Sequence, residues 1–459
     1  MDLLDQSVLP QSSHHLVLLK YLLALTYILF LPYVSVLFGS LSYSLFFRRK
    51  AEKSGENIYK RFSKELIDII TFNKGVAFAL GVVPLLSSVF GYAQLLHTSG
   101  LNVPEFLFLS LLLLIISLFL VYTYKYTFHL KDIFEYAEDK KDGNENEHEL
   151  KDEIASYLVK TGRMHKRSGF YGLIFLILAV YLFVGSVQLA MDTERWKSGN
   201  NLLSLFFSFS TLIDYLQFIA GSFAITSALI LYRFFRPNTE VVFTDEKYKS
   251  FIKSFALKTG LIATICLPVI VVLIVLVRPI NSLSYSFFFT AVVVLILLLL
   301  AAILLYMMLK ESIVTSGGAG VKYSSSLIYL LVLIFALLVI KDQFAFDTST
   351  KMQTAILVSE YDAYQIKIQE EMGVSAPISG LDIYNSRCIS CHNFDKKIVG
   401  PPYNSTLPKY EGKKDLLVKY ILNPVKVNPD YPAMPNQGLK PKEAEAVAEY
   451  LLTTYKKGK

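Results

Sequence analysis

Long apolar segments dominate the chain from its start to about residue 346. A helix of about 20 apolar residues spans the hydrocarbon core of a bilayer, so each segment predicts one membrane-spanning helix. Shorter polar stretches separate the segments and form the predicted loops. The pattern predicts eight spans, at residues 16–46, 74–97, 104–130, 169–191, 203–234, 255–277, 285–309 and 325–345.

After the last span the pattern changes to mixed polar and apolar residues. Residues at helical spacing, Ile356, Tyr361, Tyr364 and Ile368, predict a helical stalk after the last span. Residues 443–455 predict a closing helix with one apolar face. We therefore predict an all-α protein with three parts: a polytopic transmembrane bundle over 1–346, a stalk over 347–374 and a small helical domain over 375–459.

Composition and charge agree with a membrane protein. Hydrophobic residues make up 53% of the chain and charged residues 18%, and soluble proteins of this size are rarely so apolar. Basic residues collect in the loops on the cytoplasmic side of membrane proteins. Here the basic residues collect in 47–73, in 235–254 and at the end of 131–168. The first part of that last loop, 131–153, is predicted to be polar and solvated. The loops 98–103, 192–202 and 278–284 hold few basic residues and are therefore predicted to lie outside. With an even number of spans, both chain ends are then also outside.

Two thiols and an imidazole stand together in Cys388-Ile389-Ser390-Cys391-His392. This is the C-x-x-C-H attachment site of a c-type haem, in which each cysteine binds one vinyl group and the histidine faces the iron. A zinc half-site or a disulfide is the alternative, but no second Cys/His pair is present to complete a zinc site. The third cysteine, Cys266, lies in an apolar run and is predicted to be a small core residue.

Two loops follow the attachment site, Gly400-Pro401-Pro402-Tyr403 and Tyr431-Pro432-Ala433-Met434-Pro435. With the closing helix, they resemble the loops of a class I mono-haem cytochrome c domain. The resemblance implies one covalent haem c, with Pro401 and Tyr403 in its binding site, His392 as the proximal iron ligand and Met434 as the sixth. Methionine ligation raises the reduction potential and suits electron transfer. The alternative for Met434 is a core methionine.

Asp214 and Gln217 stand three residues apart in the fifth predicted span, and therefore on one face of that helix. Polar groups are costly in lipid and normally face protein or water. These two could line a proton path or a quinone pocket. The interpretation that we favour is a structural one, in which they form interhelical hydrogen bonds that hold the bundle together.

Histidines bear on whether b-type haems are present. A buried b haem usually has its histidine ligands inside the spans, and none of the histidines lies near a span centre, so b haems are not expected. An outer pair, His15 with His97, and an inner pair, His129 with His165, remain open as ligands. Apart from His392, the histidines are His14, His15 and His97 at the outer edge, His129 and His165 at the inner edge, and His148 in a polar loop.

The membrane part also resembles the large subunit of the cytochrome bd quinol oxidase family. The matching residues are Leu29-Phe30-Leu31-Pro32, Ile58-Tyr59-Lys60, Phe78-Ala79-Leu80-Gly81-Val82 and the span around Tyr215 to Gly221. Tyr27 and Gln217 stand where that family has haem-ligating histidines. The resemblance therefore implies a bd-like scaffold, fused to cytochrome c, that lacks the b haems and the oxygen chemistry.

These patterns predict a membrane-anchored c-type cytochrome of the bacterial inner membrane. Haem of this type is attached outside the cytoplasm, so the N-terminus and the haem domain are expected on the periplasmic side. We expect a non-catalytic electron-transfer subunit of a respiratory membrane complex. The main alternative is a bd-like subunit that oxidises quinol or reduces oxygen through additional b haems, and a third is a transporter or sensor coupled to the haem.

The charge of the last domain predicts its partners. Between residues 375 and 459 there are 13 lysines and arginines and 8 aspartates and glutamates, a difference of +5. Such a surface favours an acidic redox partner or an anionic membrane. The expected partners are other subunits of the complex, a periplasmic redox protein such as a soluble or multihaem cytochrome, and membrane lipid. Nucleic acid is not expected, because membrane topology explains the other basic residues.

Overall fold

The structure is a computed structural model that describes residues 10–139, 147–196, 200–236, 243, 245–314, 323–371 and 378–457. It divides into two compact units, Met1–Asp362 and Ala363–Lys459, and the division falls inside helix α13 (Lys351–Glu371). Residues 372–377, where the predicted stalk meets the predicted last domain, lie outside the described residues. Every regular element in the described part is a helix, so the predicted all-α fold class is confirmed.

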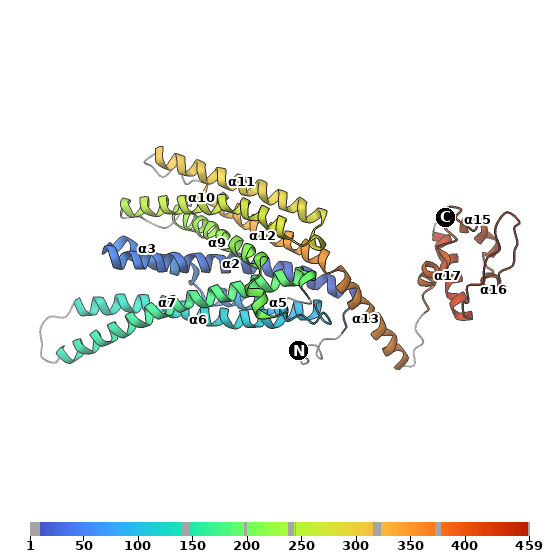
Figure 1. Cartoon of the computed structure of the whole chain (residues 1–459), viewed down its shortest axis with the longest axis horizontal. Coiled ribbons are helices and arrows are strands. Elements are labelled where there is room, and N and C mark those ends of the chain that lie inside the picture. The colour runs from blue at the N-terminus through green and yellow to red at the C-terminus, as the bar shows by residue number, and fades with distance from the viewer. Residues whose placement is uncertain are drawn as a thin grey trace. The chain divides into compact units, whose positions relative to one another are not determined.

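Among the described residues of the first unit, eight helices are long and apolar enough to cross a membrane, one for each predicted span. They run alongside one another as a bundle (Figure 1). The second span, Lys74–Leu95, combines three elements, α4 (Lys74–Ala77), the π-helix η1 (Phe78–Val82) and α5 (Val83–Leu95). The others are α2 (Ser13–Ser54), α6 (Val103–Asp139), α7 (Glu147–Met191), α9 (Phe209–Phe235), α10 (Glu246–Val277), α11 (Tyr285–Val314) and α12 (Ser324–Ser349).

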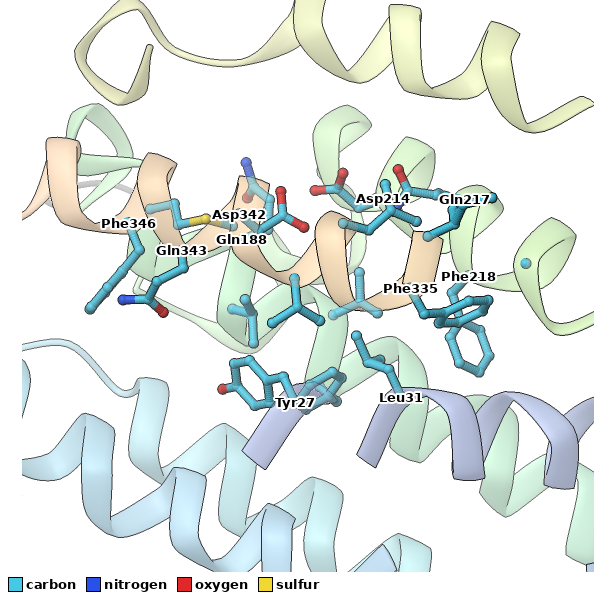
Figure 2. Close-up of a pocket in the computed structure, with 18 of the residues that line it drawn as sticks. Tyr27, Leu31, Gln188, Asp214, Gln217, Phe218, Phe335, Asp342, Gln343 and Phe346 are labelled. Carbon is cyan, nitrogen blue, oxygen red and sulfur yellow. The ribbon is translucent and has the colours of Figure 1, made fainter. Parts of the chain in front are cut away.

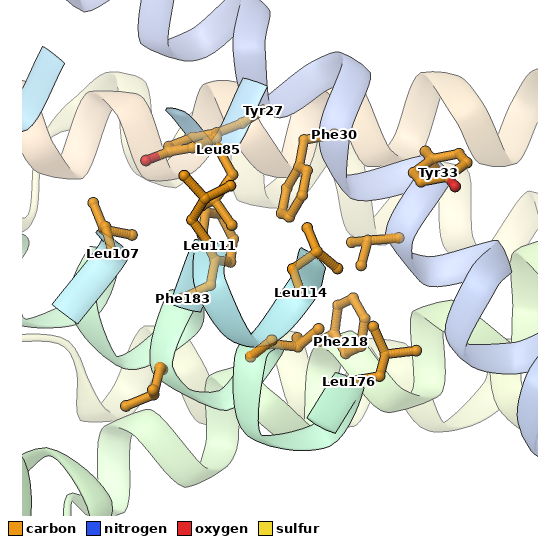
Figure 3. Close-up of a cluster of buried hydrophobic side chains, with 14 of the residues drawn as sticks. Tyr27, Phe30, Tyr33, Leu85, Leu107, Leu111, Leu114, Leu176, Phe183 and Phe218 are labelled. Atoms are coloured by element: carbon orange, nitrogen blue, oxygen red, sulfur yellow. The ribbon is translucent and has the colours of Figure 1, made fainter. Parts of the chain in front are cut away.

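Aromatic and aliphatic side chains fill the space between α2, α6 and α7 (Figure 3). The Phe183 ring packs edge-on against Tyr27 and Phe30, with ring centroids 5.3 and 4.9 Å apart. Leu111 and Leu114 of α6 belong to the same cluster, which also contains Phe218 of α9. Because lipid is as apolar as these side chains, close packing rather than water exclusion stabilises the contact.

The predicted polar loop over 131–153 is wrong for most of its length. Helix α6 continues to Asp139, and α7 begins at Glu147. Charged residues of α6 are held by ion pairs, since both Lys60 and Lys64 contact Asp132, the first at 3.2 Å. Such pairs stabilise helix ends that reach beyond the apolar core, and hydropathy alone does not detect them.

The loop over 47–73 contains a further helix, α3 (Asn57–Ile70). Its buried face packs against α2 and α10. The ring of Phe62 lies 5.1 Å from Phe47 and 5.4 Å from Phe251, between centroids. The segment therefore closes one end of the bundle as an amphipathic helix.

The fifth predicted span, 203–234, is interrupted. A short helix α8 (Leu202–Phe206) precedes α9, and the Ser208 hydroxyl caps α9 by accepting a hydrogen bond from Thr211 N.

The prediction that Cys266 is a core residue is wrong, because Cys266 is exposed on α10. An apolar run cannot separate core positions from lipid-facing ones, because both environments are apolar.

The second unit is built from short helices around one small core. Tyr384 and Cys388 contribute to that core from the attachment segment, and Val447 and Leu451 from the closing helix. The elements are α14 (Gly380–Ile383), the π-helix η5 (Tyr384–Cys388), α15 (Tyr403–Thr406), η6 (Leu407–Tyr410), α16 (Lys414–Leu422) and α17 (Pro441–Lys457).

Candidate functional site

The attachment motif forms one tight turn at the end of η5. The backbone N–H groups of Cys391 and His392 both donate to the Cys388 carbonyl, at 3.1 and 2.9 Å. Residues three apart on a helical turn share one face, so this turn presents both sulfurs together. Both cysteines are free thiols, and among the described residues no group of three or more His, Cys, Asp or Glu side chains is arranged to hold a metal ion.

The imidazole of His392 is oriented by the loop that follows it. A carbonyl can only accept, so His392 Nδ1 donates to the Pro401 oxygen, at 3.1 Å. The ring lies flat on Gly400, where a Cβ atom would overlap it, and it stacks on Tyr403 with centroids 5.0 Å apart. With Nδ1 engaged, Nε2 remains available as a metal ligand, and a hydrogen bond of this kind fixes ring orientation.

Tyr403 connects the histidine with the first cysteine. Its backbone N–H donates to the Asn393 carbonyl at 2.9 Å, which holds the side chain against the attachment turn. Burial raises the pKa of the Cys388 thiol, and the hydrogen bond with the Tyr403 hydroxyl acts in the opposite direction. Burial also raises the pKa of Tyr403, so its hydroxyl stays protonated and can donate at neutral pH.

Met434 lies between α16 and α17, in a stretch without regular structure, and its side chain is half-buried. Asn436 Nδ2 donates to the Leu422 carbonyl at 3.0 Å and anchors this stretch to the end of α16. The ammonium of Lys397 lies 4.6 Å from the centroid of the Tyr431 ring. This contact joins the loop after His392 to the Met434 loop, and the role of Met434 as an iron ligand stays a prediction.

An attachment turn with two thiols and an oriented histidine defines a c-type cytochrome domain. Residues 375–451 match the family model of cytochrome c oxidase, cbb3-type, subunit III. The chain is also 32% identical over 80 residues to cytochrome c-551 of Pseudomonas denitrificans, an alignment that covers 96% of that protein and 16% of this chain. Through its C-terminal domain the chain belongs to the cytochrome c family, so its cofactor is haem c and its activity is haem-based electron transfer.

The residues in this domain fit haem c. The two free thiols and the free Nε2 of His392 are the groups that covalent attachment and iron ligation require. The family model matches residues of the C-terminal domain and none of the membrane part. The resemblance of the membrane part to cytochrome bd therefore stays a prediction.

In the first unit, Asp214 and Gln217 line one cavity of about 100 Å³ between the spans (Figure 2). Tyr27 of α2 lines the same cavity, as do Phe218 and Phe335 from α9 and α12. The structure therefore brings together the two polar residues selected from the sequence and Tyr27, which the predicted resemblance to the bd family places at a histidine position.

Arg278, which follows α10, is the residue that sequence analysis missed. Its Nη2 donates to Asp342 at 3.0 Å and lies 3.4 Å from Asp214, and Lys341 pairs with Asp342. The side chain is 3% exposed, and its Nε and Nη1 atoms have no hydrogen-bond partner among the described residues. The available signals were an arginine directly after a span and the pair Lys341-Asp342 within the last predicted span.

The two inner-edge histidines considered as haem ligands have other side-chain contacts in the structure. His165 is buried, stacks on Tyr124 with centroids 4.3 Å apart, and bonds through Nδ1 to the Tyr124 carbonyl and to Thr127. His129 lies 3.2 Å from Asp68. Helix α7 includes position 148, but its side chain lies outside the described part.

Arg278→Gln is expected to destabilise the bundle by about 3–5 kcal/mol, because the buried Asp214 would lose its ion-pair partner, whereas Asp342 would keep Lys341. Thermal unfolding of the purified protein, followed by helical circular dichroism, measures the loss. The double variant Arg278→Gln/Asp214→Asn removes the stranded charge, since Asp342 keeps Lys341, and should recover part of the loss. Equal destabilisation in both variants would contradict an electrostatic role for this cluster.

Cys388→Ser/Cys391→Ser is expected to abolish covalent haem, because no other cysteine lies in this domain. Haem staining after denaturing electrophoresis measures the covalent fraction. Cys266→Ser is the matched control and should stain like the unmodified protein. Staining that survives in the double variant would refute the attachment site.

Proposed function

We propose that this chain is an electron-transfer subunit of a bacterial respiratory membrane complex, anchored by its spans and passing single electrons through one covalent haem. The observation that carries the proposal is the oriented His392 beside two free thiols, on a chain with eight candidate spans. When bound, haem supplies a one-electron carrier. We regard the chain as a carrier within a larger oxidoreductase.

The residues of the haem domain each have a defined task in this proposal. Cys388 and Cys391 hold the cofactor covalently, so it cannot dissociate between turnovers. Pro401 keeps the Nδ1 proton of His392 in place, and Tyr403 supports the ring from one side. Met434 would be the second protein ligand of the iron, and thioether ligation would raise the reduction potential. The site then reacts by gaining and losing electrons only.

We place the protein in the bacterial cell membrane with its N-terminus and haem domain in the periplasm. The even number of candidate spans and the distribution of basic loops support this orientation. One group of basic residues gathers at a single end of the bundle, where Lys166 of α7 reaches Glu52 of α2 at 3.4 Å. That end is the cytoplasmic one in our proposal.

The partners that we propose are other membrane subunits, membrane lipid and a periplasmic redox protein with an acidic surface, such as a soluble or multihaem cytochrome. The excess of basic residues between 375 and 459 supports the last of these, because complementary charge accelerates encounter. Salt screens such attraction over about 10 Å at ordinary ionic strength.

Met434→Ala is expected to lower the haem midpoint potential, by on the order of 100 mV, because axial ligands set the potential of haem iron. A spectroscopic redox titration measures it and should give a single one-electron transition in the unmodified protein. Met352→Ala, at an exposed position of α13, is the control and should leave the potential unchanged. An unaltered potential and spectrum in Met434→Ala would exclude it as the ligand.

The cavity around Asp214 favours a second candidate, a quinol-oxidising subunit. Aromatic walls from Phe218 and Phe335 suit a flat ring, and the polar groups of Asp214, Gln217 and Arg278 suit its oxygen atoms. Oxidation of a quinol to a quinone releases two protons and two electrons. Asp214 and Asp342, the carboxylates that line the cavity, would each accept one of the two protons. A bound haem would supply the one-electron acceptor.

The ratio of haems to protein separates the two candidates. A pyridine haemochrome spectrum of the purified protein should give one c haem and no b haem if the chain is a carrier with a single haem. One c haem together with b haem would favour the quinol-oxidising subunit. His129→Ala and His165→Ala would then show whether the inner-edge histidines hold it, by loss of the b signal.

A further inference from the structure

An open groove of about 440 Å³ runs between α6 and α7, away from the cavity around Asp214. Leu120 and Thr123 line it from α6, and Tyr171 lines it from α7. The two helices lie side by side over their length (Figure 1). Ser117 of α6 donates to the Gly172 carbonyl of α7 at 2.8 Å, which ties the helices together beside the groove.

The charged residues of this groove all carry the same sign. Lys160, Arg163 and Arg167 of α7 line it, and no aspartate or glutamate among the described residues does. Their spacing places them along one face of the helix. Within the part of the chain that the structure describes, neither Arg163 nor Arg167 forms an ion pair or donates a side-chain hydrogen bond, and both are exposed.

A neighbouring pocket shows the contrast. There, Glu52 accepts from Arg48 at 3.1 Å and from Lys166 at 3.4 Å, and Lys60 pairs with Asp132. Basic residues on this end of the bundle are therefore commonly matched by acids within the protein. The groove on α6 and α7 lacks that match, so its charge is available to a ligand.

The groove lies where α7 changes from charged to apolar sequence. Lys160 to Arg167 covers about 10 Å of helix, at about 1.5 Å per residue, and the apolar part of the span follows from residue 169. The polar headgroup layer on each side of a bilayer is about 5–7.5 Å deep, so these residues cross it and reach the water beyond. Leu120 and Tyr171 extend the groove into the apolar zone, where acyl chains lie.

We propose that this groove binds an anionic phospholipid. Arg163 and Arg167 receive the phosphate oxygens, Lys160 adds a third positive charge, and the acyl chains follow Leu120 and Tyr171. Guanidinium groups suit phosphate because they donate two parallel hydrogen bonds. The site concerns the membrane unit alone and is independent of the haem function.

The test is direct binding to the delipidated full-length protein in detergent. Native mass spectrometry would measure bound phosphatidylglycerol and, separately, bound phosphatidylcholine. The unmodified protein should prefer phosphatidylglycerol. Arg163→Gln/Arg167→Gln should weaken that lipid by about 25-fold, since each basic residue near an anionic headgroup contributes roughly fivefold in affinity, and should leave phosphatidylcholine unchanged.

Arg49→Gln/Lys53→Gln is the matched control, because it removes two exposed charges from α2 at the same end of the bundle, outside the groove. It should bind phosphatidylglycerol as the unmodified protein does, and Arg163→Lys/Arg167→Lys should retain most of the preference. An equal loss of phosphatidylglycerol binding in the control would show that overall charge, and not the groove, attracts the lipid. Unchanged binding in the Arg163→Gln/Arg167→Gln variant would also overturn the site. Full displacement by inorganic phosphate would show an anion site rather than a lipid site.

Discussion

Hydrocarbon offers no hydrogen-bond partner, and this constraint governs the first unit. Every backbone N–H and C=O group within a span must be satisfied inside the protein, which is why the spans are helices. Some of the buried hydroxyls are satisfied in the same way. Ser110 donates to the Ala179 carbonyl at 2.7 Å and Ser117 to the Gly172 carbonyl at 2.8 Å. These polar bonds set the contact between α6 and α7 and thereby shape the groove beside them.

Full charges are costlier to bury than hydroxyls, so they occur in the bundle interior as a group. Arg278 joins Asp214 and Asp342, and their attraction offsets part of the cost of removing them from water. A related arrangement occurs in the C-terminal unit, where Pro401 holds one nitrogen of His392. The Asp342 carboxylate accepts from one nitrogen of Arg278, and the Pro401 carbonyl accepts from one nitrogen of His392. In both places another nitrogen of the same side chain is available to a ligand.

A single apolar helix is sufficient to anchor a small cytochrome domain. The larger bundle of this chain contains a polar cavity and a basic groove, which is more than anchoring requires. The cavity is small and mixes aromatic walls with charged groups, whereas the groove is open and positively charged. These different chemistries support separate ligands, one within the bundle and one at its lipid-facing surface.

The sequence by itself determined the eight spans and the attachment motif, because both depend on residues close together along the chain. A run of apolar residues predicts a span without knowledge of its neighbours, and Cys388, Cys391 and His392 lie within one turn. The sequence did not determine where the charged helices end. Nor did it determine which face of a span meets lipid, and for that reason Cys266 was predicted to be a core residue. Only the tertiary structure brought Arg278 to Asp214 and Asp342, each 64 residues away along the chain. Ion pairs of this kind depend on how helices pack, and side-chain packing leaves no periodic pattern in the sequence.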